Sequence, residues 1–224
     1  MVRYKATKPD VKTGKATPNA VRRDRMAEHA INKMTVAEFV RWEDGSDTRY
    51  ELLDGTPVAM APPAVAHGML SLRLGARIEA ALRARPPRIG QSEAGIVKPD
   101  RDDTCYIADL AVTCIPPPPG QQLLAEPVLI VEVLSPGTAV YDRQTKVADY
   151  RRIPSVEEIL LIDSASVFAE VLRRAGEQWI TELVQGREAT LSLASISLTV
   201  TMADLYEEIE IQDAPETPLR LSGA

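Results

Sequence analysis

The chain is poor in the residues that build disulfide frameworks and structural zinc sites. It contains only two cysteines and two histidines in 224 residues. Cys105 and Cys114 flank one apolar run, and if this run is a strand they lie beyond disulfide reach. No Cys-x-x-Cys pair occurs. These shortages argue against both kinds of site.

Long apolar runs and several catalytic motifs are also missing. No run approaches the ~18 apolar residues of a membrane span, and no apolar signal core opens the chain. We therefore expect a cytoplasmic protein that does not bind a membrane. The absence of Gly-x-Ser-x-Gly and of a glycine-rich phosphate loop argues against serine-nucleophile chemistry and P-loop nucleotide binding.

Positive charge is scarce outside the first 33 residues. Residues 1–33 hold nine basic and three acidic residues, a net charge of +6, whereas the remainder has a net charge of −12. Because phosphate contacts dominate nucleic-acid affinity, such an acidic body would contact DNA weakly or locally. We expect a flexible basic tail over 1–33, either a DNA-tethering arm or an extension without a role. A flexible tail over 213–224 leaves one domain over 34–212.

Hydrophobic periodicity in 34–212 predicts alternating helices and strands. Apolar residues every four positions predict a long helix over 64–85, and Asp54-Gly55 predicts a hairpin turn. The order of elements predicts an α/β (α+β) domain, a mixed β-sheet with flanking helices. Beside the hairpin, we expect strands near 89–97, 106–114, 127–134, 156–162, 167–174, 178–184 and 196–201, and helices over 35–42, 138–152 and 202–209.

Two acidic residues lie in segments whose other residues are typical of buried strands. Asp109 follows Ile107 and Ala108, and Glu132 interrupts the apolar run 128–134. An ionised carboxylate inside a sheet is costly unless a positive group pairs with it. Each residue could instead lie at a solvated strand end or pair with arginine or lysine. If the two strands are neighbours, a shared Mg²⁺ would keep both carboxylates ionised, because this ion prefers oxygen ligands.

Asp142, Lys146 and Tyr150 recur every four residues in the predicted helix 138–152, so they share one face. The pattern fits an exposed Asp–Lys pair worth ~0.2–0.5 kcal/mol. It also fits a lysine aimed at an attacking water or a scissile phosphate, where its charge would stabilise developing negative charge. The sequence leaves both interpretations open.

Two further residues are candidates for the same site. Glu51 lies in the predicted strand before Asp54-Gly55 and could be a metal ligand, a group behind the ligands or a solvated residue. His67 lies near the start of the predicted helix 64–85. It could bind phosphate or act as an acid, or it could be structural or solvated.

Taken together, these segments resemble the Uma-two family of restriction-endonuclease-like proteins, which belongs to the PD-(D/E)XK nuclease superfamily. The resemblance spans about residues 34–208, in order and with matching spacing. It is carried by Tyr50-Glu51-Leu52-Leu53-Asp54-Gly55, His67, Asp109, Glu132-Val133-Leu134-Ser135-Pro136, Asp142, Lys146 and Tyr150.

By this resemblance, Asp109 corresponds to the Asp of the Pro-Asp motif, with Ala108 in place of the Pro, and Glu132 corresponds to the acid of (D/E)XK. Leu134 occupies the usual lysine position, so the resemblance assigns that lysine to Lys146 on the following helix. It also implies a restriction-endonuclease-like core, often a homodimer, and hydrolysis of a DNA phosphodiester that depends on Mg²⁺ or Mn²⁺.

The first hypothesis is accordingly a Mg²⁺-dependent endodeoxyribonuclease. Asp109 and Glu132 would bind Mg²⁺ or Mn²⁺ together with the backbone carbonyl of Val133. Glu51 would join this ligand set or bind a second ion, and Lys146 would orient or deprotonate the attacking water. The second hypothesis, favoured by the acidic body and the displaced lysine, is a catalytically inactive homodimeric binding or scaffold protein.

Overall fold

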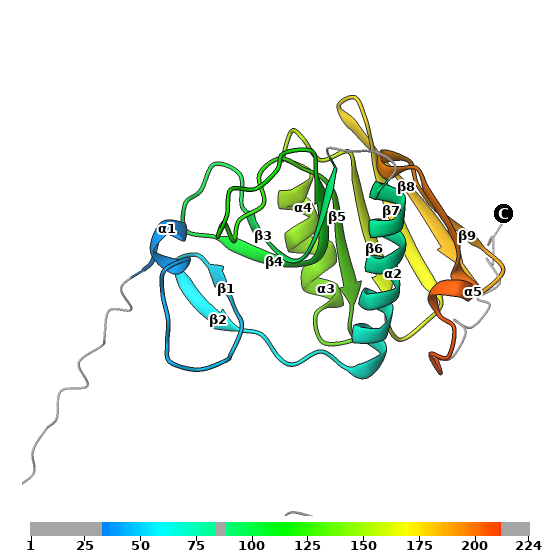
Figure 1. Cartoon of the computed structure of the whole chain (residues 1–224), viewed down its shortest axis with the longest axis horizontal. Coiled ribbons are helices and arrows are strands. Elements are labelled where there is room, and N and C mark those ends of the chain that lie inside the picture. Colours follow the sequence, from blue (N-terminus) through cyan, green and yellow to red (C-terminus); the bar gives the residue numbers. More distant parts are fainter. Residues whose placement is uncertain (1–32, 84–87, 212–224) are drawn as a thin grey trace, which may run out of the picture. The chain divides into compact units, whose positions relative to one another are not determined.

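A mixed eight-stranded sheet is the framework of residues 33–83 and 88–211, the part of the chain that the computed structural model describes (Figure 1). Seven strands follow the order β2-β1-β4-β5-β6-β7-β8, and β3 pairs with β4. β5 and β6 run parallel, and the other neighbouring strands are antiparallel. The bounds are β1 Tyr50–Leu53, β2 Thr56–Ala59, β3 Ile89–Val97, β4 Cys105–Thr113, β5 Pro127–Leu134, β6 Glu158–Asp163, β7 Phe168–Ala175 and β8 Gln178–Gln185.

Both faces of the central strands are covered, which explains why β5 is apolar at almost every position. One face packs against α2 (Val65–Arg83), α5 (Met202–Leu205) and a small sheet of β9 (Thr190–Leu193) and β10 (Leu198–Thr201). The other face packs against the helical segment 139–150. Figure 1 shows α2 lying over one face of the sheet, with the β1–β2 hairpin at one end of the sheet.

The predicted mixed sheet with flanking helices is therefore confirmed, and most of the predicted elements lie close to their expected bounds. The N-terminal helix α1 (Val36–Phe39) begins with the capping box of Thr35 and Glu38, and both of its hydrogen bonds are present. The two cysteines are free, as expected. No helix among the described residues is long and apolar enough to cross a membrane.

Four predictions of element bounds were wrong. The predicted helix 35–42 ends at Phe39. The predicted strand 196–201 begins only at Leu198, because residues 194–196 form a 3₁₀ turn that follows β9, a strand the sequence did not indicate. The predicted helix 202–209 ends at Leu205. The predicted helix 138–152 is interrupted by a π-helical turn, described below. The predicted tails, apart from Lys33, and the last two residues of the predicted helix 64–85 lie outside the described residues.

The α2 helix offers a test of this packing, because two of its leucines have opposite environments. Leu74 is fully buried against the sheet, whereas Leu72 is 75% exposed. Leu74→Ala should lower the free energy of unfolding by ~2–5 kcal/mol because it leaves a cavity. Leu72→Ala should change it by less than ~0.5 kcal/mol. Urea unfolding of both variants measures the difference, and equal losses would show that α2 is not packed in this way.

Candidate metal centre

The site lies where two neighbouring strands separate. β4 is paired with β3 along its whole length, but it is paired with β5 only from Leu110 to Thr113, and beyond Val131 the strand β5 is paired with β6 alone. At the point of separation the Asp109 carboxylate accepts a hydrogen bond from the Val133 N–H at 2.7 Å. The Asp109 side chain thus accepts the N–H of Val133 in place of a backbone carbonyl of β4. The separation opens one end of a cleft of about 1160 Å³.

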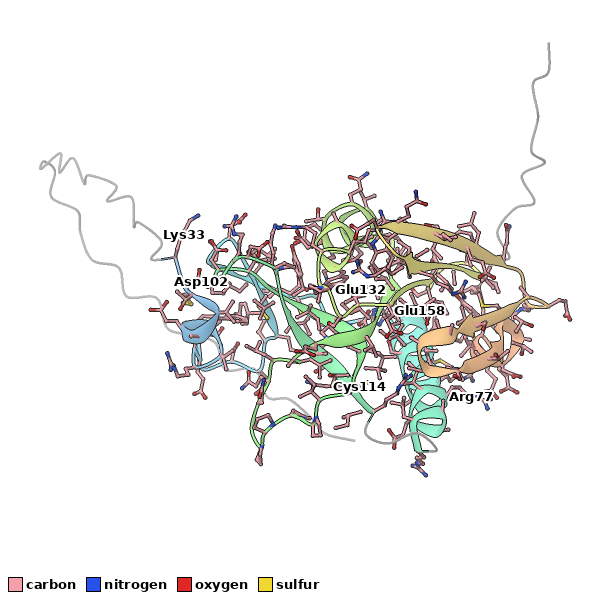
Figure 2. All side chains as sticks on the ribbon, turned by 90° about the horizontal axis from the view of Figure 1, so that it is seen from above. Lys33, Arg77, Asp102, Cys114, Glu132 and Glu158 are labelled. Atoms are coloured by element: carbon pink, nitrogen blue, oxygen red, sulfur yellow. The ribbon has the colours of Figure 1, made fainter. Side chains whose placement is uncertain are left out.

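At the floor of this cleft, one ammonium group lies among three carboxylates. Lys146 Nζ is 2.9 Å from Glu51 Oε1, 3.4 Å from Glu132 Oε1 and 3.4 Å from Asp142 Oδ1. The four residues come from β1, β5 and the segment 139–150, so distant parts of the chain meet here. Figure 2 shows Glu132 in the interior of the described region, far from its edge at Lys33.

A π-helical turn places the lysine in this cluster. The segment consists of α3 (Ala139–Tyr141), the π turn η1 (Asp142–Lys146) and α4 (Val147–Tyr150), and the N–H of Val147 donates to the carbonyl of Asp142, five residues earlier. In an α-helix, every fourth residue drifts by ~40° around the axis. The wider turn counters this drift, so the side chains of Asp142, Lys146 and Tyr150 all point toward the cluster around Glu132. Such turns are frequent at functional sites.

Burial controls the protonation of this cluster. Glu132 is only 3% exposed, and burial raises its pKa to about 8, although Lys146 opposes the shift. Burial alone would lower the pKa of Lys146, but Glu132, Glu51 and Asp142 outweigh it and raise that pKa above its usual value. Lys146 is therefore held as an ammonium ion. The alternative of an exposed Asp142–Lys146 pair is wrong, because both residues are buried.

Hydrogen bonds from two neighbours orient the carboxylates. The hydroxyl of Tyr150 donates to Glu132 Oε1 at 2.6 Å, and burial raises the pKa of Tyr150 so that it stays protonated. The N–H of Ile107 donates to Glu51 Oε1 at 3.0 Å. Glu51 is buried by these contacts, so its interpretation as a solvated strand residue is wrong.

Asp109 contacts a histidine rather than the lysine. Its Oδ1 is 3.4 Å from His67 Nε2, and this contact raises the pKa of His67. His67 Nδ1 is buried and has no hydrogen-bond partner among the described residues. All eight candidate positions, Glu51, His67, Asp109, Glu132, Val133, Asp142, Lys146 and Tyr150, thus lie at or beside one cleft.

The sequence reasoning missed a second buried network behind this cleft. The hydroxyl of Tyr106 donates to Asp149 Oδ2 at 2.6 Å, and Lys98 lies 3.0 Å from the same oxygen. The rings of Tyr106 and Tyr150 meet edge to face, with centroids 5.8 Å apart. This network therefore supports the helix that carries Lys146. Its one sequence signal was Asp149 beside Tyr150 in a helix predicted to pack on the sheet.

The donor atoms present suit a hard cation. Asp109 uses Oδ2 for the Val133 N–H, and both Tyr150 and Lys146 contact Oε1 of Glu132 rather than Oε2. Glu132 thus keeps Oε2 for another ligand, whereas Oδ1 of Asp109 is shared with His67 Nε2 at 3.4 Å. Mg²⁺ commonly takes one or two protein carboxylates and retains water. Among the described residues, however, no group of three or more His, Cys, Asp or Glu side chains is arranged to hold a metal.

The raised pKa of Glu132 predicts a pH effect on the metal-free protein. Glu132 stays protonated in the folded state up to about pH 8, whereas its ordinary value is 4.5. The folded state binds more protons between these values, so the free energy of unfolding falls as pH rises through this window. Glu132→Gln removes this contribution but keeps an acceptor for Tyr150. Urea unfolding in EDTA should show wild type losing stability relative to the variant between pH 5 and 8, and parallel profiles would contradict the assignment.

Comparisons with known proteins place the chain among related sequences. Residues 36–203 match the family described as "Uma2: Putative restriction endonuclease". The uncharacterized protein slr1290 of Synechocystis sp. is 30% identical over 78% of this chain and 92% of its own length. A second uncharacterized Synechocystis protein, sll1609, is 26% identical over 74% of this chain and 95% of its own length.

A solved structure shares the fold. It is the crystal structure of a putative nuclease belonging to DUF820 from Anabaena variabilis, with a TM-score of 0.60 and 20% sequence identity. The match covers 77% of this chain and 97% of that chain. This shared fold agrees with the resemblance found in the sequence. The family match covers residues 36–203, and slr1290 is 30% identical, so the chain belongs to the Uma2 family.

Proposed function

We propose that this protein is a metal-dependent endonuclease that hydrolyses phosphodiester bonds in DNA. The observation that carries the proposal is the excess of carboxylates around one ammonium group. Glu51, Glu132 and Asp142 all lie within 3.4 Å of Lys146 Nζ, and Asp109 lines the same cleft. Buried negative charge in excess of its partners favours binding of a cation.

Mg²⁺ or Mn²⁺ would be held by Asp109 and Glu132, with the Val133 carbonyl as a third donor. When bound, such an ion supplies the Lewis acidity that activates water and neutralises charge on the phosphate. Its binding would also keep Glu132 ionised, which the metal-free site does not do at neutral pH.

Lys146 would act through its charge. Because the carboxylates keep it protonated, it would orient the attacking water and stabilise negative charge on the phosphate rather than accept a proton. Glu51 and Asp142 would position this ammonium group, and Tyr150 would position Glu132. His67 would fix the orientation of Asp109. Glu51 contacts both Lys146 and the Ile107 N–H, which favours this positioning role over direct ligation.

The comparisons support the same class of activity. The matching family is described as a putative restriction endonuclease, and the structural neighbour is named a putative nuclease. Hydrolysis of DNA is thus the reaction that agrees both with the description of the family and with the carboxylates and lysine at the cleft floor.

The cleavage experiment compares two matched aspartates. Asp109→Asn keeps an acceptor for the Val133 N–H but weakens metal binding, whereas Asp163→Asn changes an aspartate outside the cleft that accepts the Ala165 N–H at the same distance of 2.7 Å. With Mn²⁺, wild type and Asp163→Asn should cleave DNA supplied in single-stranded and in duplex form, and Asp109→Asn should be slower on both by about a hundredfold or more. Equal cleavage by all three proteins would reject the assignment.

The alternative is a catalytically inactive scaffold on the same fold. It is favoured by Leu134 at the usual lysine position and by the lack of a group of three metal-binding side chains among the described residues. Titration with Mn²⁺ separates the two functions in the same samples. A metal site raises the melting temperature of wild type but not of Asp109→Asn, by mass action, whereas a scaffold without the site gives no shift.

We also propose that the protein forms a homodimer through β8. This strand ends the sheet, and no described strand pairs with its outer side. Ile180 and Leu183 on it are exposed apolar residues. The unpaired N–H and C=O groups of an edge strand can bind another strand. The β8 strand of a second copy would pair with these groups in a closed, two-fold arrangement.

The sequence of β8 favours one register. In a two-fold antiparallel pair, residues opposite each other must share a face of the sheet. A pair centred on Thr181 places Trp179 opposite Leu183 of the second copy, and Thr181 opposite itself. A pair centred on Glu182 would oppose two like charges and is disfavoured.

A lysine on the edge strand tests this dimer. The Leu183→Lys variant should be a monomer where wild type is a dimer, because the substitution places an ammonium group in the apolar contact between the two strands. Val140→Lys is the matched control, since Val140 is equally exposed but lies on α3. Sedimentation equilibrium reports the mass of each protein. A monomeric wild type, or dimers that persist in Leu183→Lys, would contradict this interface.

A further inference from the structure

We infer that the cleft receives an unpaired DNA strand rather than an intact duplex. This inference rests on the proposed nuclease function and adds the form of the substrate. The inference follows from a difference in polarity between two parts of the cleft. The floor carries most of the polar groups, and the walls are mainly apolar.

The walls of the cleft are apolar and open to solvent. On one side lie the β1–β2 hairpin and the segment after it, including Val58, Met60 and Pro62, and on the other side lies α2, including Leu72 and Ala76. Leu72 is 75% and Val58 42% exposed, so neither is covered by the rest of the described chain. Such exposed apolar surface beside a polar centre marks a binding surface.

The positive charges along the cleft are already paired. Among the described residues that line it, the only lysine or arginine side chains are Arg49 and Lys146. Arg49 forms an ion pair with Glu93, and Lys146 is held by its three carboxylates. The lining also includes the carboxylates of Glu51, Glu79, Glu93, Asp109, Glu132 and Asp142.

A duplex would find little to bind on these walls. Its outer surface carries one phosphate charge per ~1.7 Å of helix axis, and duplex binding depends on lysine and arginine contacts to those phosphates. The faces of its bases are stacked inside, so only the base edges in the grooves are open to side chains. The acidic lining repels every phosphate, and a second strand would add to this repulsion without burying base faces on the walls.

An unpaired strand matches both parts of the cleft. Its bases expose apolar faces that can be buried against side chains such as Leu72 and Val58. One phosphate at a time would reach the floor, where a bound cation offsets its charge. The volume of about 1160 Å³ exceeds the ~300–1000 Å³ of typical small-ligand pockets, so more than a single mononucleotide can enter. Gly68 leaves further open space on the α2 wall, because no atom lies within 4 Å of the position of a Cβ there.

The experiment uses one labelled oligonucleotide, either single-stranded or annealed to its complement. Binding to the full-length protein is measured by fluorescence anisotropy with Ca²⁺ in place of Mn²⁺, because Ca²⁺ also prefers oxygen ligands, and cleavage is measured with Mn²⁺. The basic residues 1–33 can also bind DNA, so the contribution of the cleft is read from a variant of its wall, in which residues 1–33 are unchanged. We expect the single strand to be bound more tightly and cleaved about tenfold faster than the duplex.

Leu72→Asp should weaken single-strand binding by about tenfold, because it replaces an apolar contact on the wall with a negative charge that repels phosphate. Ile115→Asp is the control, because Ile115 is an exposed apolar residue that does not line the cleft. It should bind the single strand as wild type does. Circular dichroism verifies that both variants are folded.

Three outcomes overturn the inference, and they can be told apart. Duplex cleaved as fast as single strand, with equal affinity, leaves the nuclease standing but rejects the unpaired substrate. Cleavage of neither form, without binding of either, rejects the proposed function itself. Conversion of a dimer to a monomer by Leu72→Asp would show that a second copy covers the cleft.

Discussion

The centre of this molecule depends on keeping one ammonium ion among carboxylates that are largely removed from water. Lys146 contacts Glu51, Glu132 and Asp142 together only if the helical segment, β5 and the β1–β2 hairpin all dock in one arrangement. Removing any partner from such a cluster leaves a buried charge uncompensated, which is much more costly than losing a surface ion pair. Local charge balance therefore fixes how elements far apart in the chain are placed.

Polar chemistry and apolar contact are separated in space by this arrangement. The separation of β4 from β5 gives the carboxylates access to the cleft, while the exposed sides of α2 and the hairpin form walls with few charges. Substitutions on the walls can thus change the contacts with a bound molecule without altering the charged residues at the floor. Residues such as Leu72 contribute little to folding, because they are exposed, and remain available for recognition.

Much of the core and of the site could be predicted because the signals were local. β5 was recognisable as an apolar run bounded by Pro127 and Ser135, and Glu132 stood out as the one acid within it. The spacing of Lys146 and Tyr150 indicated that both lie on one face of a helix, which is what brings them to Glu132. Breaks in a strong hydrophobic pattern are informative because burial makes them costly.

The remaining features depend on tertiary contacts that a local pattern does not contain. Glu51 is one carboxylate in a short strand, and only the packing of β1 beside β4 buries it against Lys146. β9 has only four residues, so the alternation of buried Leu191 and Leu193 with Thr190 and Ser192 lies at the lower length limit of a strand pattern. The Tyr106–Asp149 bond joins residues that are 43 positions apart. Pairing across such distances follows from the complete fold.

The widened turn at Asp142–Lys146 has an evolutionary consequence of its own. A π turn holds one more residue than the helix needs to cover the same rise. Loss of a single residue here would restore regular α-helical hydrogen bonding and leave the hydrophobic side of the segment nearly intact, but it would rotate the amine relative to its carboxylates. Descendants of this gene could therefore lose the charged centre in one small step and keep a stable scaffold.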